Sequence, residues 1–407
     1  MSKPIYVMAT PFFPSPTTWR GAYCLDFVKA LMREGTFDVR VFVPGGGADY
    51  DIDGVHVTRF PTKSLPCGAF PMLFTRANTR SFLKALARAK IDLVDVAIFH
   101  DHLSESYGCA VKALNPNCRV LLHHHSLDAF SLGLRFGRFG ILPLYSDLLY
   151  LWQRRERRGI DCDVFCSPRA DETYLQVYEG LPANRHVDVR RHLLLGRWLP
   201  DVPRKPVLYY ENGVDTRMFH PAAHKRSDDR FVIGCIGNYL VTKDQLALIQ
   251  AVEKLNDKSI FVRLVGSGKC LHACQRYVAE HGLSEQFSFE TEVRHEKLPA
   301  FYQSFDLFVL PSYWEGLGAV YLEAWASGVP FIAAEGQGMD GFICPEDRAK
   351  WLCRAHDVEG LAKMIATYRA NRWKQELAKP ADIDVMVQTF VAQVLAIVYP
   401  NIARVSR

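Results

Sequence analysis

Strand-length apolar runs alternate with helical patterns along the whole chain, and no other feature of the sequence constrains the fold as much. The apolar run at 5–9 is followed by an amphipathic stretch over 22–34 and by a second apolar run at 39–43. Similar segments follow at 93–99, 120–124, 164–167, 231–237, 243–255, 261–265, 306–310, 319–327 and 329–334. This alternation predicts α/β domains with parallel sheets covered by helices on both faces.

The length of the chain predicts two such domains. Its 407 residues exceed one ordinary core and correspond to two domains of roughly 200 residues each. The stretch FHPAAHKRSDDR, 219–230, is polar, contains a proline and carries no hydrophobic period. We therefore predict a first domain over 1–222 and a second over 223–384, each doubly wound, with ligands bound beyond the carboxyl ends of the strands.

Composition and the first residues predict a cytoplasmic protein. No apolar run approaches the ~20 residues of a transmembrane helix, and the start MSKPIYVMA lacks the zones of a signal peptide. The eleven cysteines, an odd number set mostly inside apolar runs, are typical of buried free thiols in a reducing compartment.

The net charge of +5 is unevenly placed. Residues 135–158 hold six arginines against one Asp and one Glu, and residues 185–205 hold five arginines and one lysine against two Asp. Two interpretations stay open. One is a solvated arginine-rich surface, and the other is a face that meets phosphate groups or an anionic membrane. The stretch 136–158 also carries bulky apolar residues, as an amphipathic segment in a headgroup layer would.

The stretch 307–334, LFVLPSYWEGLGAVYLEAWASGVPFIAA, carries the clearest chemistry. An apolar strand ends near Leu310, a loop with Glu315 and two glycines follows, and a helix runs until Gly328 caps it. The glycines allow the loop backbone to approach a phosphate, and a helix N-terminus offers N–H groups to an anion. From these residues alone, the pattern fits either such a site or a surface helix with two ordinary glutamates, Glu315 and Glu323.

This stretch resembles the carboxylate signature of the retaining glycosyltransferases with the two-domain GT-B fold, family 4, also called glycosyl transferases group 1. Three more segments follow the same family in order: YYENGVDTRMFHP (209–221), IGCIGNYLVTKDQLALIQAVEKL (233–255) and VRLVGSGK (262–269). The resemblance is specific over 205–335 and looser before it. It implies two Rossmann-like domains that face each other across a cleft and a C-terminal helix, 385–407, that packs back on the first domain.

The resemblance also implies roles for individual residues. Glu315 is expected to contact the transferred sugar, Glu323 the ribose of the nucleotide, and Lys243 the diphosphate. The implied catalytic residues are Glu315, Lys243 and His125. The implied donor-binding residues are Gly21, Asn238, Lys243, Gly266, Lys269, Gly316, Leu317, Gly318 and Glu323. No metal or other cofactor is expected, because a lysine and helix-terminal amides would neutralise the leaving diphosphate.

One position departs from the family's pattern, and one of the family's residues can be matched at two positions. The family usually has an arginine five residues before this lysine, and here Asn238 takes its place, with Lys269 as the candidate to compensate. An uncharged amide cannot replace a guanidinium fork. In VLLHHHSLD, 120–128, the family's histidine falls at His125, with His124 as the alternative.

The histidine run, together with His100 and His102, raises the question of zinc. Adjacent histidines alternate in direction along a strand, so His123, His124 and His125 cannot all meet one ion. We therefore expect no metal site.

The expected activity is a retaining, metal-independent hexosyltransferase that acts on a nucleotide-diphosphate sugar. The acceptor is a glycan, a lipid-linked molecule or a small molecule in polysaccharide or glycoconjugate biosynthesis. Contact with an anionic membrane surface stays open, and no nucleic-acid partner is expected. The alternatives are another GT-B enzyme of sugar nucleotides, an epimerase or a phosphorylase, and a sugar-nucleotide binding protein with weakened catalysis.

Overall fold

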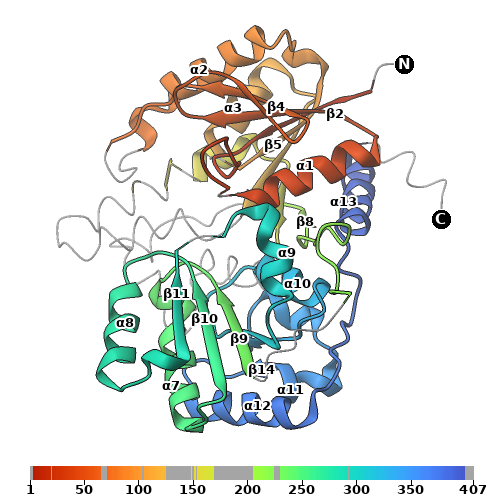
Figure 1. Ribbon diagram of the computed structural model, residues 1–407. Helices are drawn as coiled ribbons and strands as arrows, with labels where there is room; N and C mark the ends of the chain where they lie inside the picture. The colour runs from red at the N-terminus through yellow and green to blue at the C-terminus, as the bar shows by residue number, and fades with distance from the viewer. Residues whose placement is uncertain are drawn as a thin grey trace. The chain divides into compact units, whose positions relative to one another are not determined.

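The computed structural model describes residues 3–398 apart from 20, 66–70, 103–104, 125–147, 149–150, 153, 169–204, 224–229 and 292. The chain divides into two compact units, one formed by Met1–Glu211 with Val387–Arg407 and the other by Asn212–Met386 (Figure 1). Each unit is built on its own sheet, and the α/β fold class predicted from the sequence is confirmed.

The first unit holds an eight-stranded sheet with the order β3-β4-β2-β1-β5-β6-β7-β8. All neighbours are parallel except β3 and β4. Its strands and helices are β1 (Ile5–Ala9), α1 (Ala22–Glu34), β2 (Asp38–Pro44), β3 (Tyr50–Ile52), β4 (Val55–Phe60), α2 (Thr75–Arg88), β5 (Val96–Asp101), α3 (Glu105–Leu114), β6 (Arg119–His124), β7 (Cys162–Phe165) and β8 (Val207–Tyr209).

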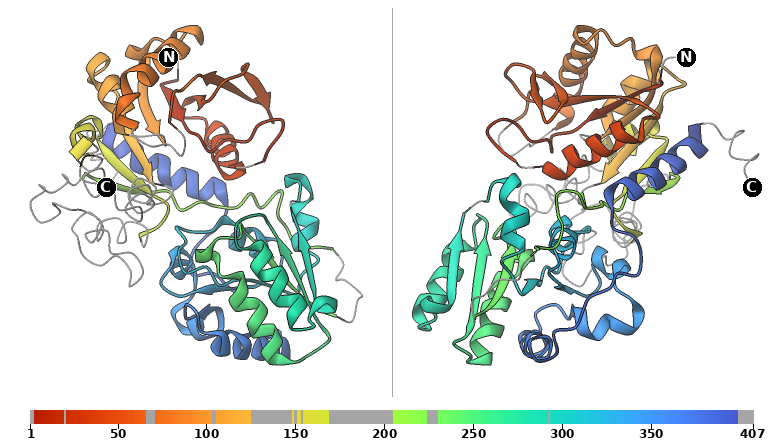
Figure 2. Two further views of the ribbon diagram at one scale, coloured as in Figure 1. Left: turned by 90° about the vertical axis from the view of Figure 1, so that its left-hand side faces the viewer. Right: turned by 45° about the vertical axis from the view of Figure 1, so that its right-hand side comes forward.

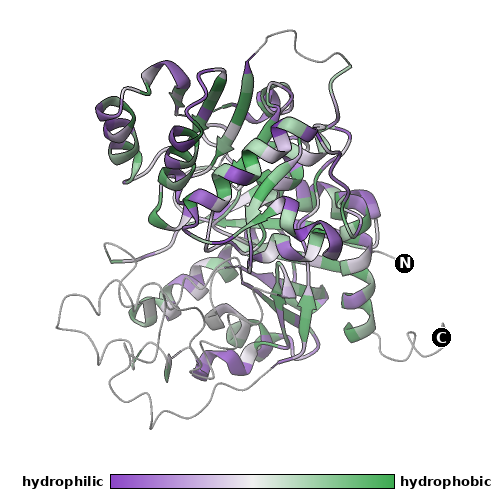
Figure 3. Ribbon diagram, turned by 90° about the horizontal axis from the view of Figure 1, so that it is seen from below, coloured by the Kyte–Doolittle hydropathy of each residue, from purple (hydrophilic) through white to green (hydrophobic). Residues whose placement is uncertain are grey.

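The second unit holds a six-stranded sheet with the order β11-β10-β9-β12-β13-β14, parallel throughout. Its strands and helices are β9 (Phe231–Ile236), α7 (Gln245–Leu255), β10 (Ile260–Val265), α8 (Leu271–Glu280), β11 (Phe287–Glu290), α9 (Leu298–Tyr302), β12 (Leu307–Leu310), α10 (Ala319–Ala326), β13 (Phe331–Ala334), α11 (Arg348–Trp351), β14 (Leu352–Cys353) and α12 (Val358–Asn371). Figure 3 shows hydrophobic residues along the strands and mixed faces on the helices, as expected of buried sheets under amphipathic helices.

In each sheet the order of the strands reverses at one point. In doubly wound folds, ligands bind at this reversal point, beyond the carboxyl ends of the strands. The order of the second sheet is the arrangement 3-2-1-4-5-6, which reverses between β9 and β12. In the first sheet the reversal lies between β1 and β5. The loops that follow these four strands are therefore where function is expected.

The units divide at 211/212, earlier than the boundary at 222/223 suggested by the sequence. The intervening residues pack within the second unit. The Val214 amide donates to the Ala381 carbonyl over 2.8 Å, and the Phe219 ring lies 6.0 Å from that of Tyr302. These contacts fix the segment before the polar stretch, where apolar periodicity gave no signal.

The last helix, α13 (Ile383–Val398), belongs to the first unit from Val387 onward. Its Gln393 side chain exchanges two hydrogen bonds of 3.2 Å with the backbone of Tyr209, and Phe390 packs 5.8 Å from Phe27 of α1. Both views in Figure 2 show this helix against the first unit's sheet. The predicted return of the C-terminal helix to the first domain is confirmed.

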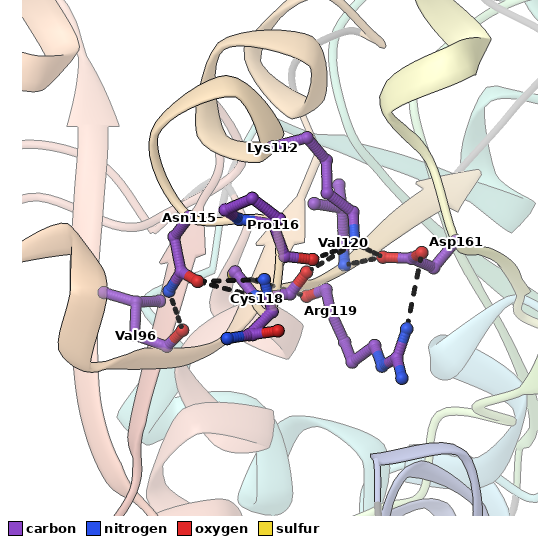
Figure 4. Close-up of polar contacts among 9 residues, drawn as sticks. Val96, Lys112, Asn115, Pro116, Cys118, Arg119, Val120 and Asp161 are labelled. Carbon is purple, nitrogen blue, oxygen red and sulfur yellow. Dashed lines mark hydrogen bonds and ion pairs between the residues drawn. The ribbon is translucent and has the colours of Figure 1, made fainter.

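Hydrogen bonds from side chains hold the backbone at the starts of β5 and β6 (Figure 4). The side-chain Nδ2 atom of Asn115 donates to the Val96 carbonyl over 3.1 Å, and its Oδ1 atom accepts from the backbone amide of Cys118 over 3.1 Å. The Asp161 carboxylate accepts from the Val120 amide over 2.8 Å. Side-chain caps of this kind set the register of the two strands that carry the histidines.

None of the described helices combines the length and apolar character that a bilayer crossing requires. The ten cysteines in the described part of the chain are free thiols, and Cys109 and Cys344, which the sequence places inside apolar runs, are only partly buried.

Candidate functional site

The loops after β9 and β12, at the reversal point of the second sheet, bring Lys243 and Glu315 together. Lys243 ends the 3-10 turn Val241–Lys243, and its ammonium group forms an ion pair with the Glu315 carboxylate. The two side chains are 19% and 16% exposed, so their charges are partly shielded from water yet open to a ligand. The structure therefore brings together two residues to which the resemblance assigns contacts with one donor molecule.

Backbone contacts hold these two loops against each other. The Thr242 carbonyl accepts hydrogen bonds from the Tyr313 amide over 3.0 Å and from the Ser312 hydroxyl over 3.1 Å. Since Thr242 precedes Lys243 and Tyr313 lies two residues before Glu315, these bonds fix the separation of the charged pair.

A further loop, which contains Gln337 and Gly338, contacts the backbone at Glu315 and Gly316 and acts as a clamp on it. The sequence did not indicate this loop. The Gln337 side chain accepts a hydrogen bond of 2.9 Å from the Glu315 amide. A Cβ atom on Gly338 would lie 1.8 Å from the carbonyl oxygen of Gly316, a distance that only glycine permits. No motif marks Gln337 or Gly338, which are separated from the glutamate by more than twenty residues.

We expect Gly338→Ala to lower turnover by roughly 10-fold or more, because the new methyl group must push the loop that carries Glu315 out of place. Gly341→Ala is the matched control in the same 3-10 turn, where a Cβ would meet only the flexible end of Lys379 at 3.3 Å. Steady-state rates and thermal melting of both variants test this. Equal activity of the two variants would show that the clamp does not position the glutamate.

The loop that contains Gly316, Leu317 and Gly318 leads into α10. Leu317 is buried, and Gly318 caps the helix with φ of 80°. Gly328, expected to cap the other end, has φ of 83° and donates its amide to the Trp325 carbonyl. The loop and both ends of the helix therefore agree with the sequence prediction.

The Gly-Ser-Gly turn after β10 is explained by packing. Gly266 and Gly268 have φ of 145° and 149°, and Cβ atoms on them would lie 2.1 Å from the Gly237 oxygen and 2.5 Å from the Tyr239 oxygen. The loop after β9 bonds to this turn along its length, for example from the Tyr239 amide to the Ser267 carbonyl over 2.9 Å. The side chains of Asn238 and Lys269, on these paired loops, are exposed.

Glu323 lies just over one turn into α10, half-buried against α9. The buried Tyr302 hydroxyl donates a 2.7 Å hydrogen bond to its carboxylate. Burial raises the pKa of Glu323 to about 7, although the tyrosine bond lowers it. Burial likewise raises the pKa of Tyr302, so the phenol stays protonated and holds the carboxylate in place. Like Gln337 and Gly338, Tyr302 was not indicated by the sequence.

We expect the free energy of unfolding to fall as pH rises from about 4.5 to 7, by roughly 2 kcal/mol on account of Glu323. In this window the folded protein keeps a proton that the unfolded chain has released. Glu323→Gln stays neutral, so its stability relative to the wild type should increase from pH 5 to pH 8. Denaturant melts at several pH values measure this, with the exposed Glu280→Gln as control. A pH-independent difference between wild type and Glu323→Gln would contradict the raised pKa.

Of the predicted site residues in the first half of the chain, Gly21 lies in the first unit and His125 lies outside the described residues. Gly21 precedes α1 with φ of 89°, and a Cβ there would lie 2.5 Å from the backbone of Phe12. Its conformation therefore requires glycine whether or not it meets a ligand.

His124, the alternative to His125, is engaged in a buried polar cluster. Its Nε2 atom lies 2.8 Å from Asp163, which also accepts a 3.0 Å bond from the buried Arg157. Burial acts to raise the pKa of Asp163, but the bonds and charges of His124 and Arg157 outweigh it and leave the pKa lowered. His124 therefore serves the core of the first unit. Arg157, part of the basic segment in the sequence, does not lie on the surface.

Each half of the chain matches a family model of glycosyltransferases. Residues 217–381 match the family model described as Glycosyl transferases group 1, and residues 21–185 match the model described as Glycosyltransferase Family 4. A GDP-mannose-dependent alpha-(1-6)-phosphatidylinositol monomannoside mannosyltransferase of Mycolicibacterium smegmatis is 34% identical over 143 residues, which are 31% of this chain and 37% of that protein. The lipopolysaccharide core biosynthesis mannosyltransferase LpsB of Rhizobium meliloti is 24% identical over 304 residues, 64% of this chain and 85% of that protein.

Solved structures share the fold. A sucrose-phosphate synthase from Thermosynechococcus elongatus has a TM-score of 0.65 at 20% identity, over 99% of this chain and 98% of that one. Anabaena HepE in complex with UDP-glucose has a TM-score of 0.60 at 15% identity, over 98% of this chain and 99% of that one.

Proposed function

Since the chain belongs to the group 1 glycosyltransferases of family 4, which have the GT-B fold, we propose that it transfers a sugar from a nucleotide-diphosphate donor with retention of the anomeric configuration. The observation that carries this proposal is the Lys243–Glu315 pair at the reversal point of the second sheet. Two comparisons support the donor class: one relative is named as GDP-mannose-dependent, and HepE was solved with UDP-glucose.

In the proposed reaction, an acceptor hydroxyl oxygen bonds to the anomeric carbon as the bond from that carbon to the diphosphate oxygen breaks. The hydroxyl proton passes to the leaving phosphate. The Lys243 ammonium group stabilises the negative charge that develops on the diphosphate, because a fixed cation needs no reorganisation as the reaction proceeds. Glu315, held through its amide by Gln337, faces the sugar, and Glu323 accepts hydrogen bonds from the ribose hydroxyls.

A panel of nucleotide sugars tests the proposal. Thermal shift identifies the donor, since at a fixed concentration a ligand that binds the folded protein more tightly raises the melting temperature further. Release of nucleoside diphosphate with glycan, lipid-linked and small-molecule acceptors then measures transfer. An isomerised sugar nucleotide formed without acceptor would favour an epimerase instead. A thermal shift without turnover on any acceptor would favour the binding protein that Asn238 suggests.

We expect the transfer reaction to proceed in excess chelator. Lys243 and the amides at the start of α10 supply the positive charge that a divalent ion provides in other enzymes. Initial rates with and without EDTA measure this. Complete loss of activity that magnesium or manganese restores would overturn metal independence.

The acceptor class and contact with an anionic membrane stay predictions. Of the four arginines near the end of the basic segment, Arg155 and Arg158 are exposed, whereas Arg157 is bound to Asp163. If this segment contacts a membrane, Arg157 is therefore not among the residues that make the contact.

A further inference from the structure

Three histidines converge on one face of the first unit's sheet. His100 lies on β5, His102 directly follows that strand, and His123 lies on the adjacent strand β6. Residues two apart on a strand share a face, and the parallel pairing of Asp101 with Leu122 places His123 beside residue 102. All three side chains are buried, and one nitrogen of each lies within 4.8 Å of the others.

The spacing of the rings suits a small cation. His100 Nε2 and His123 Nδ1 lie 3.1 Å apart. Two nitrogens bound tetrahedrally to zinc at about 2.0–2.1 Å would lie roughly 3.3 Å apart. The His102 ring centroid lies 4.3 Å from that of His100 and 4.5 Å from that of His123. A hydrogen bond between the two rings explains the approach of His100 to His123. It does not explain why the His102 ring lies beside both.

The surroundings orient the rings as they do in metal sites. The Tyr6 hydroxyl lies 2.6 Å from His100 Nδ1, which turns Nε2 toward the other histidines. Such an outer hydrogen bond fixes the tautomer of a metal-bound histidine. The rings of Phe27 and Phe390 each lie 5.9 Å from His100, so aromatic groups border the cluster. The His102 amide is anchored to the Ala9 carbonyl over 2.8 Å.

We propose that His100, His102 and His123 bind one zinc ion, whose fourth position is taken by water or another ligand. This differs from the expectation of no metal, which named His100 and His102 beside the run His123 to His125 but rested on the alternation within that run. Alternation does separate His124 from His123, but β5 contributes the two missing ligands. The three histidines belong to the first unit, whereas Lys243 and Glu315 belong to the second. Imidazole ligands suit zinc rather than Mg²⁺, and magnesium would not replace zinc here.

The experiment uses the full chain, purified without a histidine tag and freed of metal by a chelator. Titration with zinc alone, in competition with a chromophoric chelator, should show one tightly bound equivalent and a rise in melting temperature. His102→Ala should weaken binding by about 100-fold or more, and Tyr6→Phe by roughly 10- to 100-fold. His56→Ala is the control, because this histidine of β4 is exposed and pairs with the exposed Asp51 at the surface.

A second measurement keeps the test decisive if His102→Ala does not fold. Cobalt alone, added to the metal-free wild type, should give the intense visible absorption of a four-coordinate ion. Failure of the wild type to bind either ion, or zinc binding by a folded His102→Ala that equals the wild type, would overturn the proposal. Nucleotide-sugar binding and turnover, measured in separate assays, test the transferase proposal.

Discussion

Lys243→Met is expected to reduce turnover by about 10²–10³-fold, the effect of removing one fixed donor from a developing anion. Methionine keeps most of the apolar stem of lysine, so the loop after β9 should retain its packing. Affinity for the nucleoside diphosphate should fall as well, because the same ammonium group meets the diphosphate in the ground state. Initial rates of nucleotide release and calorimetric titration with the diphosphate measure the two effects.

The control for this variant is Lys254→Met on α7. Lys254 is half-exposed and pairs with Glu359 over 2.9 Å, so the control removes one surface ion pair that contributes less than about 1 kcal/mol. Wild-type rates in Lys243→Met, with the fold verified by circular dichroism, would remove Lys243 from the mechanism.

Glu315→Gln is expected to lower turnover by a similar ~10²–10³-fold while nucleoside diphosphate binding stays equal or becomes tighter. Without a ligand, the Glu315 carboxylate forms an ion pair with Lys243, so an incoming diphosphate competes with it for the ammonium group. Glutamine keeps the shape but removes the competing charge. Opposite effects on nucleotide affinity therefore distinguish the roles of the two partners.

Glu335→Gln serves as the control for Glu315→Gln, because its carboxylate lies at the surface 3.9 Å from Arg354. The double variant Lys243→Met with Glu315→Gln should lose far less than the product of the two single effects, since paired groups act as a unit. Independent, multiplicative losses would show that the ion pair is incidental to catalysis.

Much of the fold could be predicted because apolar periodicity reports burial directly. The expected strand at 5–9 and helix at 22–34 match β1 and α1. The strand expected at 93–99 begins only at Val96, because Asp92 caps a 3-10 turn over Leu93–Asp95. The helix expected from 243 begins at Gln245, because Asp244 adopts a left-handed conformation with φ of 50°. Local turn chemistry of this kind shifts the ends of elements without changing their type.

The candidate site could be predicted only in part. Lys243 and Glu315 stand in segments with a recognisable pattern, whereas Gln337 and Tyr302 act through single tertiary hydrogen bonds that leave no local signal. For the histidine cluster, the sequence raised the question of zinc, but the expectation of no metal did not include the pairing of strands. His100 and His102 lie about twenty residues from His123, and only the pairing of β5 with β6 brings them together.

The division of the first unit between the two ends of the chain has a consequence for biosynthesis. A ribosome releases the chain from its N-terminus, and domains generally fold as units while synthesis proceeds. The second unit, continuous over Asn212–Met386, can complete its core before the chain is finished. The first unit cannot, because Phe390 and Gln393 are synthesised last. Until then, Phe27 and Tyr210 lack their contacts with the Phe390 ring, and the backbone of Tyr209 lacks its hydrogen bonds to Gln393. The half of the protein that is made first is therefore the half that matures last, and a nascent chain stalled before Val387 would present that apolar face to chaperones.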